Sequence, residues 1–387
     1  MSRRSLIGRF LSRLLTFIVI LTLLLGAAVK WRYGGGNDFP ARDTPPQMPA
    51  SALERVADLP TPPGNISVSA SGRIFVSLHP EARPAWKVVE LVDGQMKPFP
   101  NLAFQTGEGE PDSFDTVLGV RVDAQNRLWV LDNGNHGLHP ARLLAFDIDS
   151  GELVENFSFP REIAGYGSHL NDLQVMPDGN TIFISDASLL AQSPALIVYD
   201  VANHSARRVL GEHPSVTAEY YTPRVQGRRM ELFYLFSVRP GVDAVGLDAN
   251  GLWLYFAPVT SLHLYRVKTA DLMDESLSAS QLANRVEIFA PKTMTDGISV
   301  DQRGNVYLTD IEHSAIAVLW QDRTLGTLIQ SPLLRWPDGL SFGPDGALYI
   351  TCSSLQQVLG RLPVQIDRAA PYQVYRVRVG VPGIPGR

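Results

Sequence analysis

Short apolar stretches separated by tight turns recur along most of the chain. Each copy consists of a strand with alternating apolar residues, a turn that contains Gly or Asn, and a second strand rich in β-branched and aromatic residues. The turn residues lie 42 to 72 residues apart: Gly72, Asn126, Gly179, Gly251, Gly304 and Gly346. A unit that recurs at this spacing is typical of a fold built from small repeated sheets.

A third apolar strand follows each pair, for example at residues 86–91 and 142–147. A small sheet of this kind buries its two faces only against its neighbours, so the ring of sheets has to close. Residues 53–59 have the composition of a strand and precede the first complete copy. We expect them to join the last sheet, which begins near Leu340, and to lock the two ends of the ring together. The sequence therefore predicts an all-β fold, a six-bladed β-propeller.

The N-terminal segment differs in character from the rest of the chain. Four arginines between residues 3 and 13 precede an uncharged apolar run at residues 14–29, and aromatic and basic residues follow up to Tyr33. This order predicts one hydrophobic helix that acts as a signal anchor or as a cleaved signal peptide. The basic flank places the N-terminus in the cytoplasm and the folded domain outside it.

These features divide the chain into four parts. We predict that residues 1–33 are the signal anchor or signal peptide, residues 34–50 a Gly/Pro-rich linker, residues 51–379 the six-bladed β-propeller, and residues 380–387 a tail. The longest interval between turns contains residues 211–240, which are rich in Tyr, Arg and Pro. We expect this segment to form a loop over one mouth of the ring.

Composition narrows the possible functions. With 34 basic and 39 acidic residues, the formal net charge of −5 argues against nucleic-acid binding, which requires a basic face. The single cysteine, Cys352, excludes an intramolecular disulfide and a zinc site made of thiolates. The sequence also contains no P-loop, no nucleophile elbow and no dinucleotide-binding glycine motif.

Four polar residues occupy the same place in four consecutive repeats. Each stands eight residues before the turn glycine of its repeat: Asn171, Asp243, Asp296 and Asp338. A fixed offset from a repeated turn means an equivalent position at the start of the innermost strand, so we expect these side chains to converge at one mouth. The carboxylates repel one another unless a cation lies among them. Oxygen ligands without His or Cys favour Ca²⁺ or Mg²⁺, and a polar organic ligand is the other candidate.

Turn capping is the structural alternative for these four residues, because Asx side chains commonly bond their own backbone. The first two repeats carry Gly64 and Leu118 at the same offset, which would place a metal off the axis, and Asn65 offers a possible fifth oxygen. His169 and Asp172 lie beside the first of the four residues and are candidate catalytic residues, suited to act as a general base. An ordinary loop histidine is the alternative for His169.

Several other polar residues have simpler interpretations. Asp132, Asp186 and Asp310 end second strands and are predicted to be structural caps. His136 and His139 lie three residues apart in a Gly/Asn-rich loop and are either a metal-binding pair or plain loop residues.

Several stretches carry a family resemblance. Residues 114–117 (Phe-Asp-Thr-Val) and 128–134 (Leu-Trp-Val-Leu-Asp-Asn-Gly) resemble the strand pair before the signature of the major royal jelly/yellow protein family. Residues 252–258 and 336–340 resemble later parts of that family in the same order, so the likeness covers roughly residues 60–360. The chain is therefore similar to a bacterial member of this family.

This resemblance implies a six-bladed β-propeller. Insect members include secreted nutritional proteins, binders of biogenic amines and proteins linked to dopachrome conversion, whereas bacterial relatives have no settled chemistry. The insect proteins also use disulfides, which a chain with one cysteine does not form within itself.

A more distant similarity is to the senescence marker protein/gluconolactonase and paraoxonase propellers. These bind a divalent cation in the central tunnel, and the corresponding stretches here are residues 171–172, 296–298 and 337–339. Lactonase-type propellers place a Glu at the start of the first blade, where this chain has Pro-Gly-Asn-Ile at residues 63–66.

We expect a membrane-tethered, extracytoplasmic propeller that binds a small molecule in its central funnel. A Ca²⁺- or Mg²⁺-dependent hydrolase of lactones and a dopachrome-type isomerase are the alternatives. The expected partners are a small-molecule ligand or substrate and, through the N-terminal helix, the membrane, with no nucleic acid. The expected location is the cell membrane with the domain outside, or the periplasm or medium if the leader is cleaved.

Overall fold

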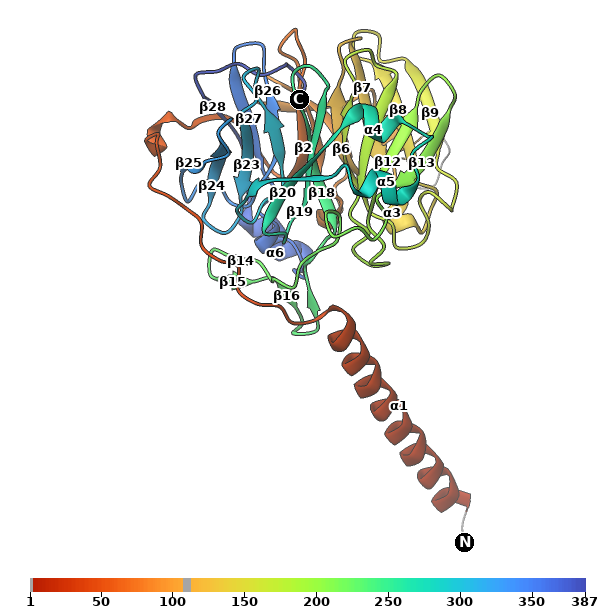
Figure 1. Ribbon diagram of the computed structural model, residues 1–387. Coiled ribbons are helices and arrows are strands. Elements are labelled where there is room, and N and C mark those ends of the chain that lie inside the picture. Colours follow the sequence, from red (N-terminus) through yellow and green to blue (C-terminus); the bar gives the residue numbers. More distant parts are fainter. Residues whose placement is uncertain (1–2, 107–112) are drawn as a thin grey trace.

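The computed structural model describes residues 3–106 and 113–387, except for the side chains of residues 3–8. Six sheets form a ring, and a single long helix, α1 (Arg3–Tyr33), projects from one end of it (Figure 1). The first two residues of the predicted signal segment lie outside the described residues. The prediction of an all-β, six-bladed β-propeller preceded by one hydrophobic helix is confirmed.

Each blade is a four-stranded antiparallel sheet whose first strand lies next to the central axis. The first three blades contain, from the axis outward, β2 (Pro63–Val68), β3 (Ile74–Leu78), β4 (Val88–Val92) and β5 (Gln95–Pro98); β6 (Val117–Val122), β7 (Arg127–Asp132), β8 (Arg142–Asp147) and β9 (Leu153–Ser158); and β10 (Leu170–Val175), β11 (Thr181–Asp186), β12 (Ala195–Asp200) and β13 (Ser205–Val209). The next two contain β18 (Val242–Leu247), β19 (Trp253–Pro258), β20 (His263–Lys268) and β21 (Glu287–Pro291); and β22 (Ile298–Val300), β23 (Val306–Asp310), β24 (Ala315–Leu319) and β25 (Leu325–Gln330). The sixth combines β26 (Pro337–Phe342), β27 (Ala347–Cys352) and β28 (Tyr372–Arg378) with the outermost strand β1 (Glu54–Leu59).

Short elements connect these strands. They are the hairpins β14 (Arg224–Val225) with β15 (Arg228–Arg229) and β16 (Glu231–Leu232) with β17 (Phe236–Ser237), and the helices α2 (Ala103–Thr106), α3 (Gly134–Gly137), α4 (Thr269–Met273), α5 (Ala279–Ala283) and α6 (Pro363–Ala369).

The ring is closed by a strand from the N-terminal side of the propeller. β1 pairs with β28, with Leu59 opposite Tyr372, as predicted for residues 53–59. An ion pair of 2.8 Å between Glu54 and Arg376 crosses the same strand pair. Because β1 covers an edge of unpaired N–H and C=O groups, the first and last strands of the propeller stabilise one sheet together.

The core consists of apolar layers between neighbouring blades. Between the second and third blades, for example, Trp129 and Leu143 belong to one buried cluster with Leu173 and Ile182. A sheet covered on both faces buries nearly every residue, and all six residues of β27 are buried. This explains why the inner strands are apolar over most of their length.

α1 is long and apolar enough over Arg9–Tyr33 to span a membrane, with a mean hydropathy of 2.2 in its apolar window. A signal sequence meets the same criteria, so the structure is compatible with both predicted forms of the segment. The predicted linker runs along the propeller, since Asn37 forms a bridge with Tyr221 and Met48 forms one with Ile329.

The two mouths of the ring differ. At the mouth where the innermost strands begin, the segment 211–240 contributes Pro223, Val238 and Pro240 to the lining of the central cavity, in agreement with its predicted position. α1 leaves from this end, and the C-terminal end of the chain lies at the other (Figure 1).

The other mouth is filled by residues 383–387, which we call the plug. The backbone oxygen of Gly386 accepts hydrogen bonds from Ser67 Oγ at 2.9 Å and from Arg121 Nη1 at 3.2 Å. Arg387 is buried and donates to the backbone oxygens of Val175 at 3.4 Å and Asp248 at 3.0 Å. The segment predicted as a tail thus makes contacts with several blades and blocks this end of the tunnel.

Candidate functional site

The four residues at the repeated offset lie around one central cavity. Asn171, Asp243, Asp296 and Asp338 all line a cavity of about 90 Å³ at the start of the innermost strands, together with Asn65. We call this cavity the funnel, and the three aspartates the carboxylate cluster. The predicted convergence of these side chains from four blades is therefore what the structure contains.

Irregular pairing marks the repeated position. The register between the first and second strands shifts there in five blades, for example between Leu170 and Leu173, between Val242 and Ala244, and between Pro337 and Leu340. In the remaining blade, Asp296 lies two residues before β22 begins. A β-bulge bends its strand and redirects a side chain, so these shifts aim the polar groups at the axis instead of into the layers between blades.

Buried hydroxyl groups hold the repeated positions of adjacent blades side by side. Ser77 Oγ accepts a hydrogen bond from Asn65 N at 2.9 Å within its own blade and donates to Leu118 O of the next blade at 2.6 Å. Thr351 Oγ1 accepts from Gly339 N at 2.8 Å and donates to Gly64 O at 2.5 Å. Ser185 makes the same two kinds of bond, to Asp172 N and Asp243 O, between the third and fourth blades.

Close packing of the innermost strands also requires glycine beside the cluster. A Cβ atom on Gly297 would lie 1.8 Å from the backbone oxygen of Asp338. Such contact is sterically impossible without displacement of one strand, and that displacement would separate Asp296 from Asp338.

The carboxylate cluster is held in an unfavourable electrostatic environment. Burial raises the pKa of Asp243 well above its usual range, and the charges of Asp296 and Asp338 raise it further. Burial also raises the pKa of Asp296 to about 6. A hydrogen bond from Trp336 Nε1 at 2.5 Å has the opposite, smaller effect and lowers this pKa. The pKa of Asp338 is raised by burial and then by the charge of Asp296. A positive charge in the funnel would favour the ionised form of all three.

The donor chemistry suits a hard cation, but the arrangement is not that of a formed metal centre. Asp243 accepts a hydrogen bond from Asn171, and Asp296 accepts one from Trp336. Within residues 3–106 and 113–387, no three His, Cys, Asp or Glu side chains are grouped so that they could hold a metal ion. The Ca²⁺ or Mg²⁺ site at Asn171, Asp243, Asp296 and Asp338 therefore stays a prediction.

Asp172, a predicted catalytic residue, lies deeper than the cluster and is engaged by its neighbours. Its Oδ1 accepts hydrogen bonds from Asn65 Nδ2 at 2.8 Å, from Leu173 N at 2.8 Å and from the buried Arg121 Nη2 at 3.1 Å. These bonds connect the funnel to the plug because Arg121 also contacts Gly386. This environment favours a structural role for Asp172 over that of a general base.

The wall of the funnel is mainly apolar. It is formed by Leu118, Leu189, Pro223, Val238, Pro240, Val259, Trp336, Leu355 and Leu359. An apolar wall above a few convergent polar groups is typical of sites for small organic ligands.

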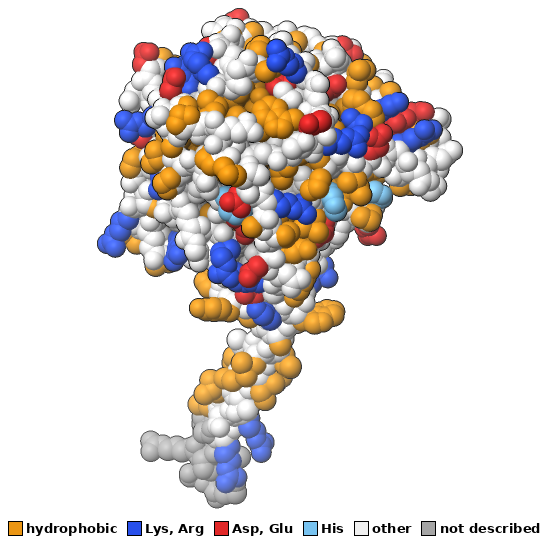
Figure 2. Space-filling model, turned by 60° about the vertical axis from the view of Figure 1, so that its left-hand side comes forward, with side chains coloured by type: hydrophobic (Ala, Val, Ile, Leu, Met, Phe, Trp, Pro, Cys, Tyr) orange, Lys and Arg blue, Asp and Glu red, His pale blue; other side chains and the backbone are white. Residues whose placement is uncertain are grey.

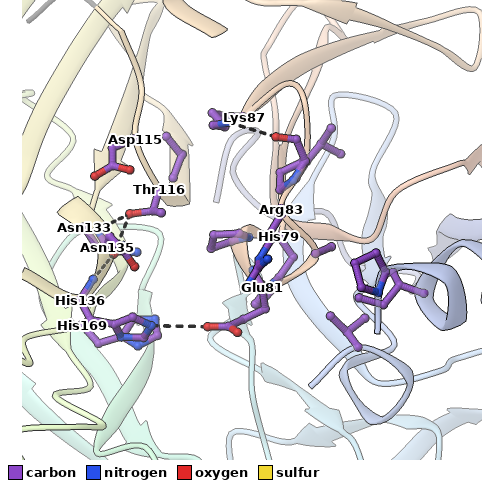
Figure 3. Close-up of a pocket in the computed structure, with 18 of the residues that line it drawn as sticks. His79, Glu81, Arg83, Lys87, Asp115, Thr116, Asn133, Asn135, His136 and His169 are labelled. Carbon is purple, nitrogen blue, oxygen red and sulfur yellow. Dashed lines mark hydrogen bonds and ion pairs between the residues drawn. The ribbon is translucent and has the colours of Figure 1, made fainter. Parts of the chain in front are cut away.

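A larger cavity of about 920 Å³, the vestibule, adjoins the funnel (Figure 3). It lies between the loops that follow β3, β7 and β27, and three residues line both cavities: His79, Glu81 and His169. Burial lowers the pKa of His79 to about 4 and that of His169 to about 3, so both rings are neutral at pH 7.

His169, the other predicted catalytic residue, has an unusual environment. Its ring lies edge-on to His136 with centroids 4.5 Å apart. Both of its ring nitrogens are buried with no hydrogen-bond partner among the described residues. Figure 3 shows the two histidines pointing across the vestibule toward Glu81, which pairs with His136 at 3.4 Å. That hydrogen bond is the main reason why the pKa of Glu81 is lowered to about 2.

The two loop histidines have separate partners. His139 Nδ1 lies 2.6 Å from Asp115 Oδ2, whereas His136 faces Glu81 and His169. They do not share a ligand position in this arrangement.

The three predicted caps are confirmed. Asp132 accepts from the backbone N–H of Asp115 and of Thr116, each at 2.9 Å. Asp186 accepts from His169 N at 2.7 Å, and Asp310 accepts from His313 N at 3.2 Å.

Four residues that shape the site were not predicted from the sequence. Arg121 lies within an apolar strand-like stretch, Trp336 lies in a bend just before β26, and His79 and Glu81 lie in a loop without a repeated offset. A signal for the hydroxyl groups did exist, since Ser77, Thr309 and Thr351 each stand five residues after a turn glycine.

The fold and site together define a class, the six-bladed propellers with an acidic central funnel. Residues 115–360 match the major royal jelly protein family, and this chain belongs to that family. Major royal jelly protein 3 of Apis mellifera is 24% identical over 241 residues, which are 59% of this chain and 42% of the relative. Major royal jelly protein 7 of the same bee is 24% identical over 59% of this chain and 52% of its own length. The chain thus matches about half the length of these curated relatives.

Solved structures share the fold at low sequence identity. A luciferin-regenerating enzyme superposes with a TM-score of 0.56 at 13% identity, covering 86% of this chain and 97% of that one. A putative gluconolactonase superposes with a TM-score of 0.54 at 15% identity, covering 89% of this chain and 95% of that one. A calcium-binding protein, regucalcin from Agrobacterium tumefaciens, superposes with a TM-score of 0.53 at 15% identity, covering 87% of this chain and 96% of that one. These similarities establish the propeller fold and agree with the second resemblance seen in the sequence.

Proposed function

We propose that this protein is a membrane-tethered, extracytoplasmic propeller that binds a small, positively charged organic molecule in its funnel. The observation that carries the proposal is the carboxylate cluster at the bottom of a mainly apolar cavity. Burial and mutual repulsion oppose ionisation of these aspartates, and an ammonium group among them would relieve both.

The sizes of the two cavities suit such a ligand. The funnel, at about 90 Å³, accommodates a small charged group, whereas the vestibule, at about 920 Å³, lies within the range of sites for small organic molecules. An amine bound with its charge on Asp296 would contact the Trp336 ring, which already donates to that carboxylate.

α1 supports the proposed location. Its span is apolar over Arg9–Tyr33 and precedes the whole propeller. With the basic residues at its N-terminal side, this order favours a propeller outside the cytoplasmic membrane. Cleavage of the leader would release the same domain into the periplasm or medium.

A metal-dependent hydrolase of lactones is the second candidate. It is favoured by the oxygen donors of the funnel, which include Asn65 and Asn171 beside the cluster, and by the unpartnered ring nitrogens of His169. The dopachrome-type isomerase rests on the family resemblance alone.

Calorimetry on the full chain in detergent distinguishes these functions. We expect tyramine to bind and 4-ethylphenol, which has the same ring without the amine, to bind at least about tenfold more weakly. Asp296→Asn should lower the affinity for tyramine by at least about tenfold, because a buried charge pair loses one partner. Asp322→Asn, a change at an exposed turn carboxylate, is the matched control and should leave the affinity unchanged.

Two outcomes contradict the proposal. Binding of CaCl₂ without binding of tyramine, abolished by Asp296→Asn, would favour the hydrolase. Equal binding of tyramine and 4-ethylphenol would show that the carboxylate cluster does not recognise charge.

A further inference from the structure

Exposed apolar side chains gather at the funnel end of the propeller. The side chains of Phe233 and Tyr234 are 76% and 84% exposed at the turn between β16 and β17. Leu138, Tyr166, Leu190 and Leu362 are also exposed, on loops at the same mouth. At the plug end, the exposed large apolar side chains of the described residues are Leu252 and Met273 in the connection regions and Leu153, Val154 and Ile288 near the starts of β9 and β21.

Contacts join these loops into one face. Arg161 lies over the ring of Tyr166 and donates to the backbone oxygen of Leu138 at 3.3 Å. Phe233 lies near Gly360, two residues before Leu362, which lines the vestibule. We call this surface the mouth face. Figure 2 shows hydrophobic side chains at the base of the propeller on both sides of the point where the helix meets it.

The mouth face is also the surface to which α1 is fixed. The ring of Tyr33, at the end of the helix, stacks on Phe236 with centroids 5.0 Å apart, and its hydroxyl donates to Leu190 O at 2.8 Å. Arg239 donates to Tyr33 O at 3.1 Å, and Lys30 forms an ion pair with Glu231. The helix is thus attached directly to the propeller, without a free spacer between them.

Because α1 is fixed to the mouth face, the position of the helix in a bilayer also sets the position of this face. With α1 across a bilayer, its last turn lies at the lipid–water boundary, which places the adjoining apolar loops at the depth of the headgroups. Aromatic residues such as Trp31 and Tyr234 are enriched at that boundary. The exposed Arg83 and Arg361 line the vestibule and suit the phosphate groups of lipids.

We propose that the mouth face lies on the surface of the bilayer that α1 spans, so that ligands enter the funnel from the headgroup layer through the vestibule. This inference rests on the tethering in the proposed function and narrows its ligand to amphipathic cations that accumulate at membrane surfaces. The lipid surface continues from the apolar helix to the mouth face, and this continuity identifies lipid as its partner.

Fluorescence quenching in nanodiscs tests the arrangement. The full chain is reconstituted in phosphatidylcholine nanodiscs with or without a lipid that carries a quencher near its headgroup. Tyr234→Cys and Leu362→Cys, each with an environment-sensitive fluorophore, probe the mouth face, and Leu252→Cys is the matched control at the plug end. The native Cys352 is fully buried, so the label attaches to the introduced residue. Leu21→Cys, with a quencher deep in the acyl chains, reports whether α1 is inserted.

We expect quenching at positions 234 and 362 to be at least twice that at position 252. If position 21 is quenched and positions 234 and 362 are quenched no more than position 252, α1 spans the bilayer but the mouth face does not lie on it. This result would overturn the inference and leave the proposed membrane tether intact. If position 21 is not quenched, the tether fails and the docking fails with it. Thermal denaturation of each labelled variant confirms that it is folded. Tyramine binding by the Leu252→Cys variant, whose label lies away from the vestibule, reports on the funnel independently of both.

Discussion

Individual carboxyl groups in the funnel have pKa values above their usual range. Asp296 combines a buried carboxylate with a Trp336 hydrogen bond that takes up one of its oxygens. Its pKa is raised from the usual 3.8 to about 6, so the folded protein binds this proton more tightly than the unfolded chain does. The resulting stabilisation is full below about pH 4 and is lost as the pH rises through about 6.

The Asp296→Asn variant should therefore change the pH dependence of stability. Relative to this variant, we expect the free energy of unfolding of the ligand-free wild type to fall between pH 4 and pH 6. Thermal denaturation of both proteins across this range measures the difference. Asp322→Asn should show no such slope in this range. Hydrogen bonds from Thr324 lower the pKa of Asp322 from its usual 3.8, so its effect has the opposite sign and falls below about pH 4. Parallel curves for wild type and Asp296→Asn would show that this carboxylate titrates normally.

At the scale of strands and loops, buried hydroxyl groups link the first blade to the second, the third to the fourth and the sixth to the first. Thr351 joins β27 both to its own innermost strand and to Gly64 of the first blade, at the point where the ring closes. Its hydroxyl is fully buried, so its removal leaves two backbone groups without partners.

Thr351→Val keeps the shape of the side chain and removes these bonds. We expect a loss of about 2 kcal/mol or more in the free energy of unfolding, because each buried unpaired group costs about 1–3 kcal/mol. Denaturation in urea measures this loss. Thr217→Val, at an exposed loop hydroxyl that bonds a single backbone oxygen, is the control. If the two variants lose equal stability, the hydroxyl groups between blades contribute little to closure.

The sequence was most informative where a position repeats. The offset from the turn glycine identified Asn171, Asp243, Asp296 and Asp338 because four of the blades place a polar residue at the same point. The offset carried no information on which side-chain oxygens near the funnel already accept hydrogen bonds within the protein. Arg121, for example, donates to Asp172 from another blade. The vestibule combines loops far apart in the sequence, so no local pattern indicated that His79 and His169 line one cavity.

For the whole molecule, residues at both ends of the propeller take part in closing it. β1 completes the sixth blade, and the plug contacts the innermost strands through Ser67, Arg121, Val175 and Ser299. The ring is therefore stabilised at its outer edge and along its axis.

Deletion of residues 383–387 should lower the melting temperature by at least about 3 °C, because a loss of 1 kcal/mol shifts a large domain by about 2–4 °C. We expect tyramine affinity to change by less than about threefold, since the carboxylate cluster lies at the other end of the tunnel. Calorimetry and thermal denaturation of the same preparation measure both. An unchanged melting temperature would mean that the plug does not stabilise the ring.

The plug also determines the geometry of ligand traffic. With Arg121 and residues 383–387 across the far end, arrival and departure use the same opening. An amine bound as proposed, with its charged group on the cluster, would therefore keep its opposite end directed outward. That end would tolerate chemical extension. On the proposed binding mode, a resin that carries the amine through its apolar terminus, by a spacer as long as the vestibule is deep, would retain the native protein from a detergent extract.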